Sequence, residues 1–115
     1  MSLLNDIQVW TSACAYDHLV PCRGVGVLLP NGEQAALFRL DDGSLHAVGN
    51  IDPFSGAAVL SRGIVGDRGG RATVQSPIKK QAFALDDGVC LDDATRSVPV
   101  YATRITADGF VEIGS

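Results

Sequence analysis

The sequence predicts an all-β protein with an antiparallel sandwich fold, because tight-turn dipeptides recur between short apolar segments. Several of these segments alternate apolar and polar side chains, as residues 101–105 do, which is typical of half-buried antiparallel strands. Short strands separated by tight turns indicate a sandwich or a barrel. The dipeptides favour the primed turns of β-hairpins, with positive φ at both central positions, and they are Asn31-Gly32, Asp42-Gly43, Asp87-Gly88 and Asp108-Gly109.

The strand-like segments follow one another along the whole chain. Helix is predicted only as single turns, at residues 15–19 before Pro21 and at residues 57–61. The chain has 115 residues and shows no repeat, low-complexity tract or linker, so we expect one domain over residues 1–115. The predicted strands are residues 8–13, 25–29, 35–40, 45–48, 64–66, 72–75, 81–85, 98–104 and 111–113.

Composition excludes several classes of partner. The net charge of −4 and the pI near 4.8 argue against nucleic acid. No apolar run approaches the ~20 residues of a membrane span.

The N-terminal MSLLNDIQVW has neither the basic nor the apolar region of a signal peptide. The three cysteines, Cys14, Cys22 and Cys90, are an odd number without a CxxC motif, which predicts reduced thiols and a cytoplasmic protein.

The charge is unevenly distributed along the chain. Residues 50–80 carry five cationic and two anionic side chains, a net charge of +3, so the remainder of the chain carries −7. A basic segment on an acidic scaffold indicates a docking face for an acidic partner. The alternative interpretation is that these charges are scattered and solvated, as most charge runs are.

Two motifs have residue types that occur in metal or phosphate sites. Cys14, His18 and Cys22 have the spacing of ligands on one helix face, but Pro21 interrupts such a helix and a structural zinc site normally needs four ligands. We therefore predict ordinary cysteines there. The glycine-rich residues 66–70 lack the Lys-[ST] and the strand–helix context of a phosphate loop and predict a hairpin turn.

No catalytic constellation stands out. The chain has only two histidines, His18 and His46, and His46 lies on a predicted strand. It has no G-x-S-x-G motif and no evident oxyanion loop. We expect no catalytic residue on this chain.

The most informative region contains two proline-containing frames, Asp52-Pro53-Phe54 and Ser76-Pro77-Ile78-Lys79. Their outline resembles the cluster-binding loops of Rieske proteins, which carry Cys-x-His in one loop and Cys-x-x-His in the other to hold a [2Fe–2S] centre. Asp52 and Ser76 stand at the two cysteine positions, and Phe54 and Lys79 at the two histidine positions. A phenyl ring and a protonated amine have no lone pair for iron.

This resemblance implies a Rieske-like antiparallel β-sandwich in which residues 50–80 form a small, loop-rich, vestigial cluster-binding subdomain at one tip. We expect no metal or cofactor on this chain. Phe54 is interpreted as a core plug beneath the vacated pocket, the alternative being an exposed contact. Lys79 and Lys80 cannot both be buried, so at least one faces water or a partner.

Residues 50–93 also resemble the small subunit of assimilatory NAD(P)H-dependent nitrite reductase, through the strings NIDPF, VLSRGIVGD, VQSPIKKQAFAL and DGVCLDD. That family is Rieske-like and lacks the cluster ligands. The resemblance implies a large-subunit partner that carries FAD, an iron–sulfur cluster and sirohaem and reduces nitrite to ammonium with electrons from NADH or NADPH. This chain would then be a non-catalytic subunit of that oxidoreductase.

We expect the vacated loop tip to meet the large subunit. Two alternatives remain open at this stage. The first is a free-standing Rieske-like domain for interaction or regulation, and the second is an electron-transfer ferredoxin, against which the missing ligands argue. The residues expected at the interface are Pro53, Phe54, Arg62, Pro77, Lys79 and Lys80.

Overall fold

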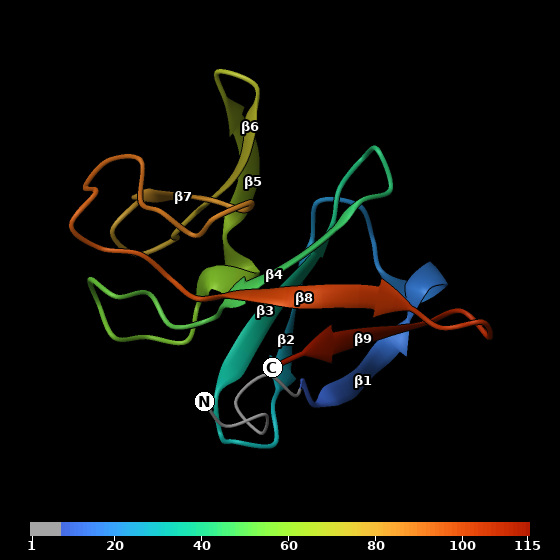
Figure 1. Cartoon of the computed structure of the whole chain (residues 1–115). Coiled ribbons are helices and arrows are strands. Elements are labelled where there is room, and N and C mark those ends of the chain that lie inside the picture. The colour runs from blue at the N-terminus through green and yellow to red at the C-terminus, as the bar shows by residue number, and fades with distance from the viewer. Residues whose placement is uncertain (1–7) are drawn as a thin grey trace, which may run out of the picture.

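The computed structural model describes residues 8–115 and confirms the predicted all-β antiparallel class (Figure 1). Its helical content is two short 3₁₀ turns, η2 (Tyr16–His18) and η3 (Leu60–Arg62), each within a predicted helical turn or overlapping it. The strands are β1 (Trp10–Ala15), β2 (Gly24–Leu28), β3 (Gln34–Arg39), β4 (Leu45–Gly49), β5 (Ile64–Arg68), β6 (Arg71–Gln75), β7 (Ala82–Ala84), β8 (Val100–Ile105) and β9 (Phe110–Gly114).

Residues 1–7 lie outside the described part of the chain. The prediction about a signal peptide concerns residues 1–10, so most of that segment is not described either. Within residues 8–115, no helix is both long and apolar enough to cross a membrane.

The strands form two antiparallel sheets of unequal size. Six strands make the large sheet in the order β1-β9-β8-β4-β3-β2, and three make the small sheet in the order β5-β6-β7. Figure 1 shows the small sheet and its loops standing to one side of the large sheet, with the β5–β6 hairpin projecting furthest. This small sheet, together with the loops around it, is the subdomain that carries the two proline frames.

Strand β3 lies at the centre of the packing and is buried on both faces. Its residues Ala35, Ala36, Leu37 and Phe38 are all fully buried. Ala36 and Phe38 point into one apolar cluster and Ala35 and Leu37 into another. The half-buried alternation expected of the strands therefore does not hold for β3, because a strand with a core on each side becomes continuously apolar.

The two clusters have different positions. The scaffold core lies within the curled large sheet and consists of Leu19, Leu29, Ala35, Leu37, Ala47, Val111 and Ile113. The junction core joins the large sheet to the small subdomain and consists of Ala36, Phe38, Val48, Leu60, Val74, Phe83, Leu85, Cys90 and Val98. Through the junction core, packing of apolar side chains holds the subdomain on the scaffold.

The expectation of primed turns was wrong at the four predicted dipeptides. At each of them only the glycine has a positive φ, and the Asn or Asp before it does not. In three of them the side-chain oxygen of the Asn or Asp instead accepts the backbone N–H two residues further on. This local hydrogen bond is that of an Asx-turn and favours a turn in which only the glycine is left-handed. Within residues 8–115, two consecutive left-handed residues occur at Gly69-Gly70, the tip of the β5–β6 hairpin. The hairpin predicted for residues 66–70 is confirmed, but its turn is confined to these two glycines because residues 66–68 belong to β5.

Candidate functional site at the loop tip

The two proline frames meet through a buried hydrogen bond. The Ser76 hydroxyl donates to Asp52 Oδ2 at 2.6 Å. Asp52 is 0% exposed and Ser76 is 1% exposed, so the bond is shielded from water. Because the two residues lie 24 positions apart, this bond fastens the loop after β4 to the loop after β6. The two residues that the sequence comparison matched to cluster cysteines are thus adjacent in space.

The Asp52 carboxylate is supported by its own loop as well. Its Oδ1 accepts the backbone N–H of Phe54 at 2.8 Å, and its backbone carbonyl accepts the N–H of Gly56 at 2.7 Å. Burial raises the pKa of this carboxyl, but the hydrogen bonds from Ser76, Phe54 and Ser55 outweigh it, so the pKa lies below its ordinary value. Asp52 is therefore a buried, ionised acceptor.

Ser76 also organises the turn that follows it. Its backbone carbonyl accepts the N–H of Lys80 at 3.1 Å, and its N–H donates to the carbonyl of Gln81 at 3.0 Å. The Ser76 hydroxyl oxygen accepts the N–H of Ile78 at 3.3 Å. The side chain of Gln75 donates to the Lys80 carbonyl at 3.0 Å. Residues 76–81 thus form a turn whose backbone is closely braced.

Phe54 packs as a partial plug against the junction core. Its ring lies 6.2 Å from the ring of Phe83, centroid to centroid, and Phe83 is fully buried. The guanidinium of Arg96 covers Phe54 from outside, at 5.4 Å from the ring centroid, and donates to the Pro53 carbonyl at 2.8 Å. Arg96 could not be assigned to this site from the sequence, since nothing in its local sequence links it to a loop 43 residues away.

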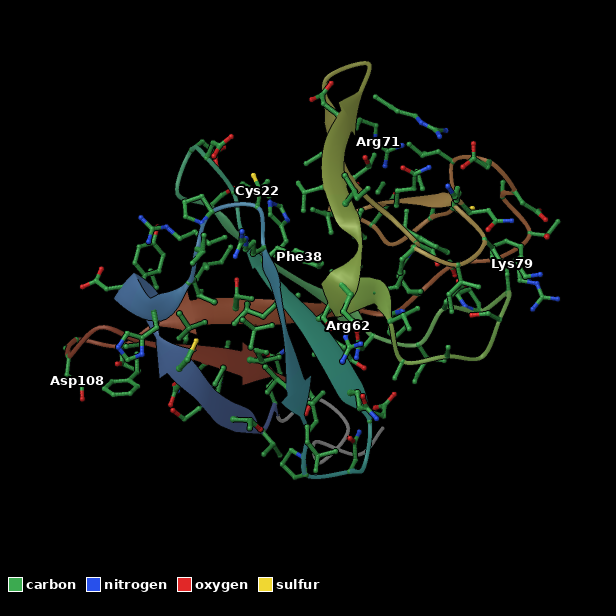
Figure 2. All side chains as sticks on the ribbon, turned by 180° about the vertical axis from the view of Figure 1, so that it is seen from behind. Cys22, Phe38, Arg62, Arg71, Lys79 and Asp108 are labelled. Carbon is green, nitrogen blue, oxygen red and sulfur yellow. The ribbon has the colours of Figure 1, made fainter. Side chains whose placement is uncertain are left out.

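The expected interface residues do not all share one place. Pro77, Lys79 and Lys80 are exposed on the braced turn, and Pro53 is half-buried on the other loop. Figure 2 places Lys79 at the outer end of the small subdomain, whereas Arg62 lies on η3 close to the large sheet. Arg62 therefore does not flank Lys79, because η3 packs against β2 and β3 and not against the loop tip.

Lys80 has an uncommon backbone conformation. Its φ of 64° lies in the left-handed region, and Cys22 is the other described residue besides glycines with a positive φ. A side chain in this region is strained by roughly 1–2 kcal/mol, which is why glycine or asparagine usually occupies it. The two hydrogen bonds at the Lys80 backbone hold it there.

The residues at the four ligand positions do not fit a [2Fe–2S] cluster. A Rieske centre takes two thiolates and two imidazoles. Here the Asp52 carboxylate is already engaged with the Ser76 hydroxyl, the Phe54 ring fills space against Phe83, and Lys79 faces outward. The two loops are joined here by the hydrogen bond between Asp52 and Ser76.

Cys14, His18 and Cys22 do not share a helix face, in agreement with the interruption expected at Pro21. Cys14 lies on β1, His18 on η2 and Cys22 in the turn before β2. Cys14 packs beside the scaffold core, and burial raises the pKa of its thiol. In the described part of the chain, no three His, Cys, Asp or Glu side chains are gathered as a metal ion would require.

The fold and the two loops define a Rieske-like protein. The family model of the Rieske-like [2Fe-2S] domain matches residues 9–114, nearly the whole chain.

Comparison with similar proteins identifies the family within the Rieske-like class. The nitrite reductase (NADH) small subunit of Salmonella typhimurium is 43% identical over 105 residues, covering 90% of this chain and 95% of that protein. A crystal structure from Mycobacterium tuberculosis, described as an NADH-dependent nitrite reductase small subunit, is 75% identical with a TM-score of 0.93, covering 96% of this chain and 97% of that one. The chain belongs to the family of NADH nitrite reductase small subunits.

A third similarity is of a different kind. The nitrite reductase [NAD(P)H] large subunit of Klebsiella oxytoca is 38% identical over 107 residues. The match covers 92% of this chain but 11% of the Klebsiella protein, so that protein contains a segment similar to this chain within a much longer polypeptide.

Proposed function

We propose that this chain is the non-catalytic small subunit of a cytoplasmic nitrite reductase. In this proposal it docks on a large subunit that holds FAD, an iron–sulfur cluster and sirohaem and reduces nitrite to ammonium with electrons from NADH or NADPH. The chain itself contributes a folded surface and no redox group, since the four residues at the ligand positions do not fit a cluster.

The observation that carries this proposal is the Klebsiella polypeptide. A protein named as a large subunit contains a segment that matches 92% of this chain. Two segments joined in one polypeptide are held together permanently, and the same pair on separate chains needs an interface to stay together. This supports a direct contact between the small and the large subunit.

The loop tip is the surface proposed for that contact. Lys79 and Lys80 make no ion pair with any carboxylate in the described part of the chain, and Ile78 between Pro77 and Lys79 is 48% exposed. The braced turn therefore presents one apolar side chain beside two free ammonium groups. Such a surface complements an acidic area with an apolar depression, and charges at its rim would act mostly on the association rate.

The strain at Lys80 supports a role for its charge. A glycine at this position would relieve the left-handed strain without disturbing the two backbone hydrogen bonds. A lysine held there at a cost in folding stability is typical of positions where strain serves a site.

The direct test is co-purification of this chain with the large subunit of the same organism, combined with an assay of nitrite-dependent oxidation of NADH and of NADPH. We expect a stable complex whose activity exceeds that of the large subunit alone. Lys79→Glu/Lys80→Glu should weaken complex formation, most strongly at low salt, with the unfolding free energy within ~0.5 kcal/mol of wild type.

Arg71→Glu is the matched control, because it reverses an exposed charge of the same subdomain away from the tip. If the double variant folds and binds the large subunit as well as wild type at low salt, the loop tip is not the interface. If wild type does not bind the large subunit, the chain is a free-standing domain.

An iron assay separates this proposal from an electron-transfer ferredoxin. Protein purified anaerobically should be colourless and contain no stoichiometric iron. Absorption bands of an iron–sulfur cluster would contradict the non-redox role, whatever the outcome of the binding experiment.

A further inference from the structure

The arginines of this chain divide into two groups by their contacts. Five of the seven are held by an acceptor or a ring within the protein. No ion pair, hydrogen bond or ring contact within residues 8–115 involves the guanidinium of Arg23 or of Arg62. The five with partners are Arg39 on the Tyr16 and Leu19 carbonyls, Arg68 on Asp92, Arg71 on Asp86 and Asp87, Arg96 on the Pro53 carbonyl, and Arg104 on Glu112.

The two arginines without a partner line the same hollow. It has a volume of about 220 Å³ and lies where η3 meets the start of β2, at the seam between the two sheets. Figure 2 labels Cys22 and Arg62, two of the residues that line this hollow. Both arginines are exposed, so their head groups reach solvent. The lining residues are Cys22, Arg23, Gly24, Ser61, Arg62 and Gly63.

Close backbone packing brings the two arginines to one hollow. Gly24 follows Arg23, and a Cβ atom at Gly24 would lie 2.3 Å from the Ser61 carbonyl oxygen, so only glycine permits this approach. Ser61 in turn precedes Arg62. The chain segments that carry the two guanidinium groups are therefore in direct contact.

Each of these segments is fixed by hydrogen bonds. The N–H of Arg23 donates to the Val20 carbonyl at 3.1 Å, and the N–H of Arg62 donates to the Val59 carbonyl at 2.9 Å. The side chain of Asn50, 4% exposed, accepts the N–H of Ser61 at 2.7 Å. The hollow is thus preformed in the free chain, and only the two side-chain ends need to be ordered by a ligand.

We propose that this hollow binds a carboxylate side chain of the large subunit, as a second contact distinct from the loop tip. Two arginines at one hollow bring two positive charges to the same place, and a planar oxyanion bound there can neutralise them through charge-assisted, bidentate hydrogen bonds. A hollow of about 220 Å³ can seat the end of an Asp or Glu side chain. This inference rests on the proposed function for the identity of the partner.

A neighbouring hollow gives this contact a direction. Cys22 also lines a second hollow, whose walls include Asp41, Asp42 and Asp67. None of these carboxylates is within ion-pair distance of Arg23 or Arg62. A partner surface must therefore place its acidic group at the arginine-lined hollow and keep other acidic groups away from the aspartate-lined hollow on the other side of Cys22. This arrangement of charges determines the orientation of the partner more than the affinity of the complex.

The first test uses acetate as a probe of the isolated full chain. In a nuclear magnetic resonance titration at constant ionic strength, with chloride exchanged for acetate, we expect saturable shifts of the Gly24, Ser61 and Gly63 amide signals. They should vanish in Arg23→Gln/Arg62→Gln and persist in Arg71→Gln. Shifts that are absent, or that are equal in the double variant, would overturn the inference.

The second test measures binding to the large subunit. Arg23→Gln/Arg62→Gln should weaken binding by about tenfold or more, whereas Arg71→Gln, which removes an exposed cationic group elsewhere, should change it less than twofold. Equal binding by wild type and the double variant overturns this inference and leaves the proposed function intact. A wild-type chain that does not bind the large subunit overturns both.

Discussion

The scaffold core and the loop tip are built from different kinds of interaction. The scaffold core contains only apolar side chains, from Leu19 to Ile113, and joins strands β3, β4 and β9 of the large sheet. The loop tip is joined by polar contacts between distant segments, with the bond between Asp52 and Ser76 at its centre and Arg96 over its outer surface. Between them the junction core, with Phe83 as its largest subdomain side chain, is apolar again.

This difference separates what keeps the fold from what shapes the site. Apolar packing is non-directional and tolerates substitution by residues of similar volume. Buried hydrogen bonds are directional, and each partner left alone is costly. The tip is therefore the part of the molecule in which a single substitution alters geometry without unfolding the scaffold.

The largest effect is expected in the junction core. Phe83→Ala removes a fully buried ring and should lower the free energy of unfolding by about 3–5 kcal/mol in urea denaturation. Phe54→Ala, the matched change in the half-buried ring that contacts it, should cost clearly less, since water can fill the space. Equal losses would mean that the tip is as integral to the core as Phe83 is.

The next effect concerns the hydrogen bond between the loops. Asp52→Ala leaves the Ser76 hydroxyl and the Phe54 N–H without their acceptor and should lower stability by about 1–3 kcal/mol. Ser76→Ala removes only the hydroxyl donor and leaves the carboxylate its hydrogen bond from the Phe54 N–H. Comparing the two variants therefore separates the loss of the acceptor from the loss of the donor. Chemical denaturation at pH 7 measures both, and an unchanged stability in Asp52→Ala would show that the bond contributes nothing.

The same carboxylate gives a pH dependence with a defined sign. The pKa of Asp52 is lowered in the folded state, so its contribution is complete above the unfolded value near ~3.9 and is lost as the pH falls through the folded pKa. Asp52→Asn should therefore flatten the acid limb of a plot of stability against pH. Wild-type and variant curves that stay parallel below pH ~4 would contradict this assignment.

A smaller effect of opposite sign is expected at the exposed turn. Lys80→Gly relieves left-handed strain but adds freedom to the unfolded chain, with a net gain of roughly 0.5–1 kcal/mol. Lys79→Gly is the control, because Lys79 has no positive φ and should lose stability. A variant Lys80→Gly that is more stable but binds the large subunit more weakly would separate the function of this residue from its structural effect.

The smallest effect is expected at the exposed ion pairs of the small sheet. Arg71 pairs with Asp86 and Asp87 in solvent, where water and salt screen the interaction. Arg71→Gln should leave the thermal midpoint unchanged within experimental error. A clear drop would indicate that surface charges, and not only buried hydrogen bonds, hold the subdomain.

The strands could be predicted from the sequence because their signal is local. Each of the nine strands within residues 8–115 overlaps a predicted segment, and Gly69-Gly70 turns where a turn was expected. The type of turn at the four Asn-Gly and Asp-Gly dipeptides could not be predicted from those two residues alone. The choice of turn depends on whether the Asn or Asp oxygen finds a backbone N–H, as Asp42 does at Ser44.

The site was predictable only in part. The frames at Asp52 and Ser76 could be located from the sequence, because the spacing of a cluster motif persists without its ligands. The side chains that complete the tip could not, since Arg96 and Phe54 lie 42 positions apart and meet only after the chain has folded. The position of Arg62 was also missed, because a basic segment of sequence gives no information about which face each residue takes.

The hydrogen bond between Asp52 and Ser76 joins two ordinary side chains of the polypeptide. A loop tip fastened in this way is finished as soon as the polypeptide folds, without delivery of iron or sulfide by any maturation system. Oxygen and peroxides, which destroy exposed iron–sulfur centres, have no target in a carboxylate bonded to a hydroxyl. In the proposed cluster-free role, the amount of functional subunit depends on synthesis of the chain alone and not on the supply of iron.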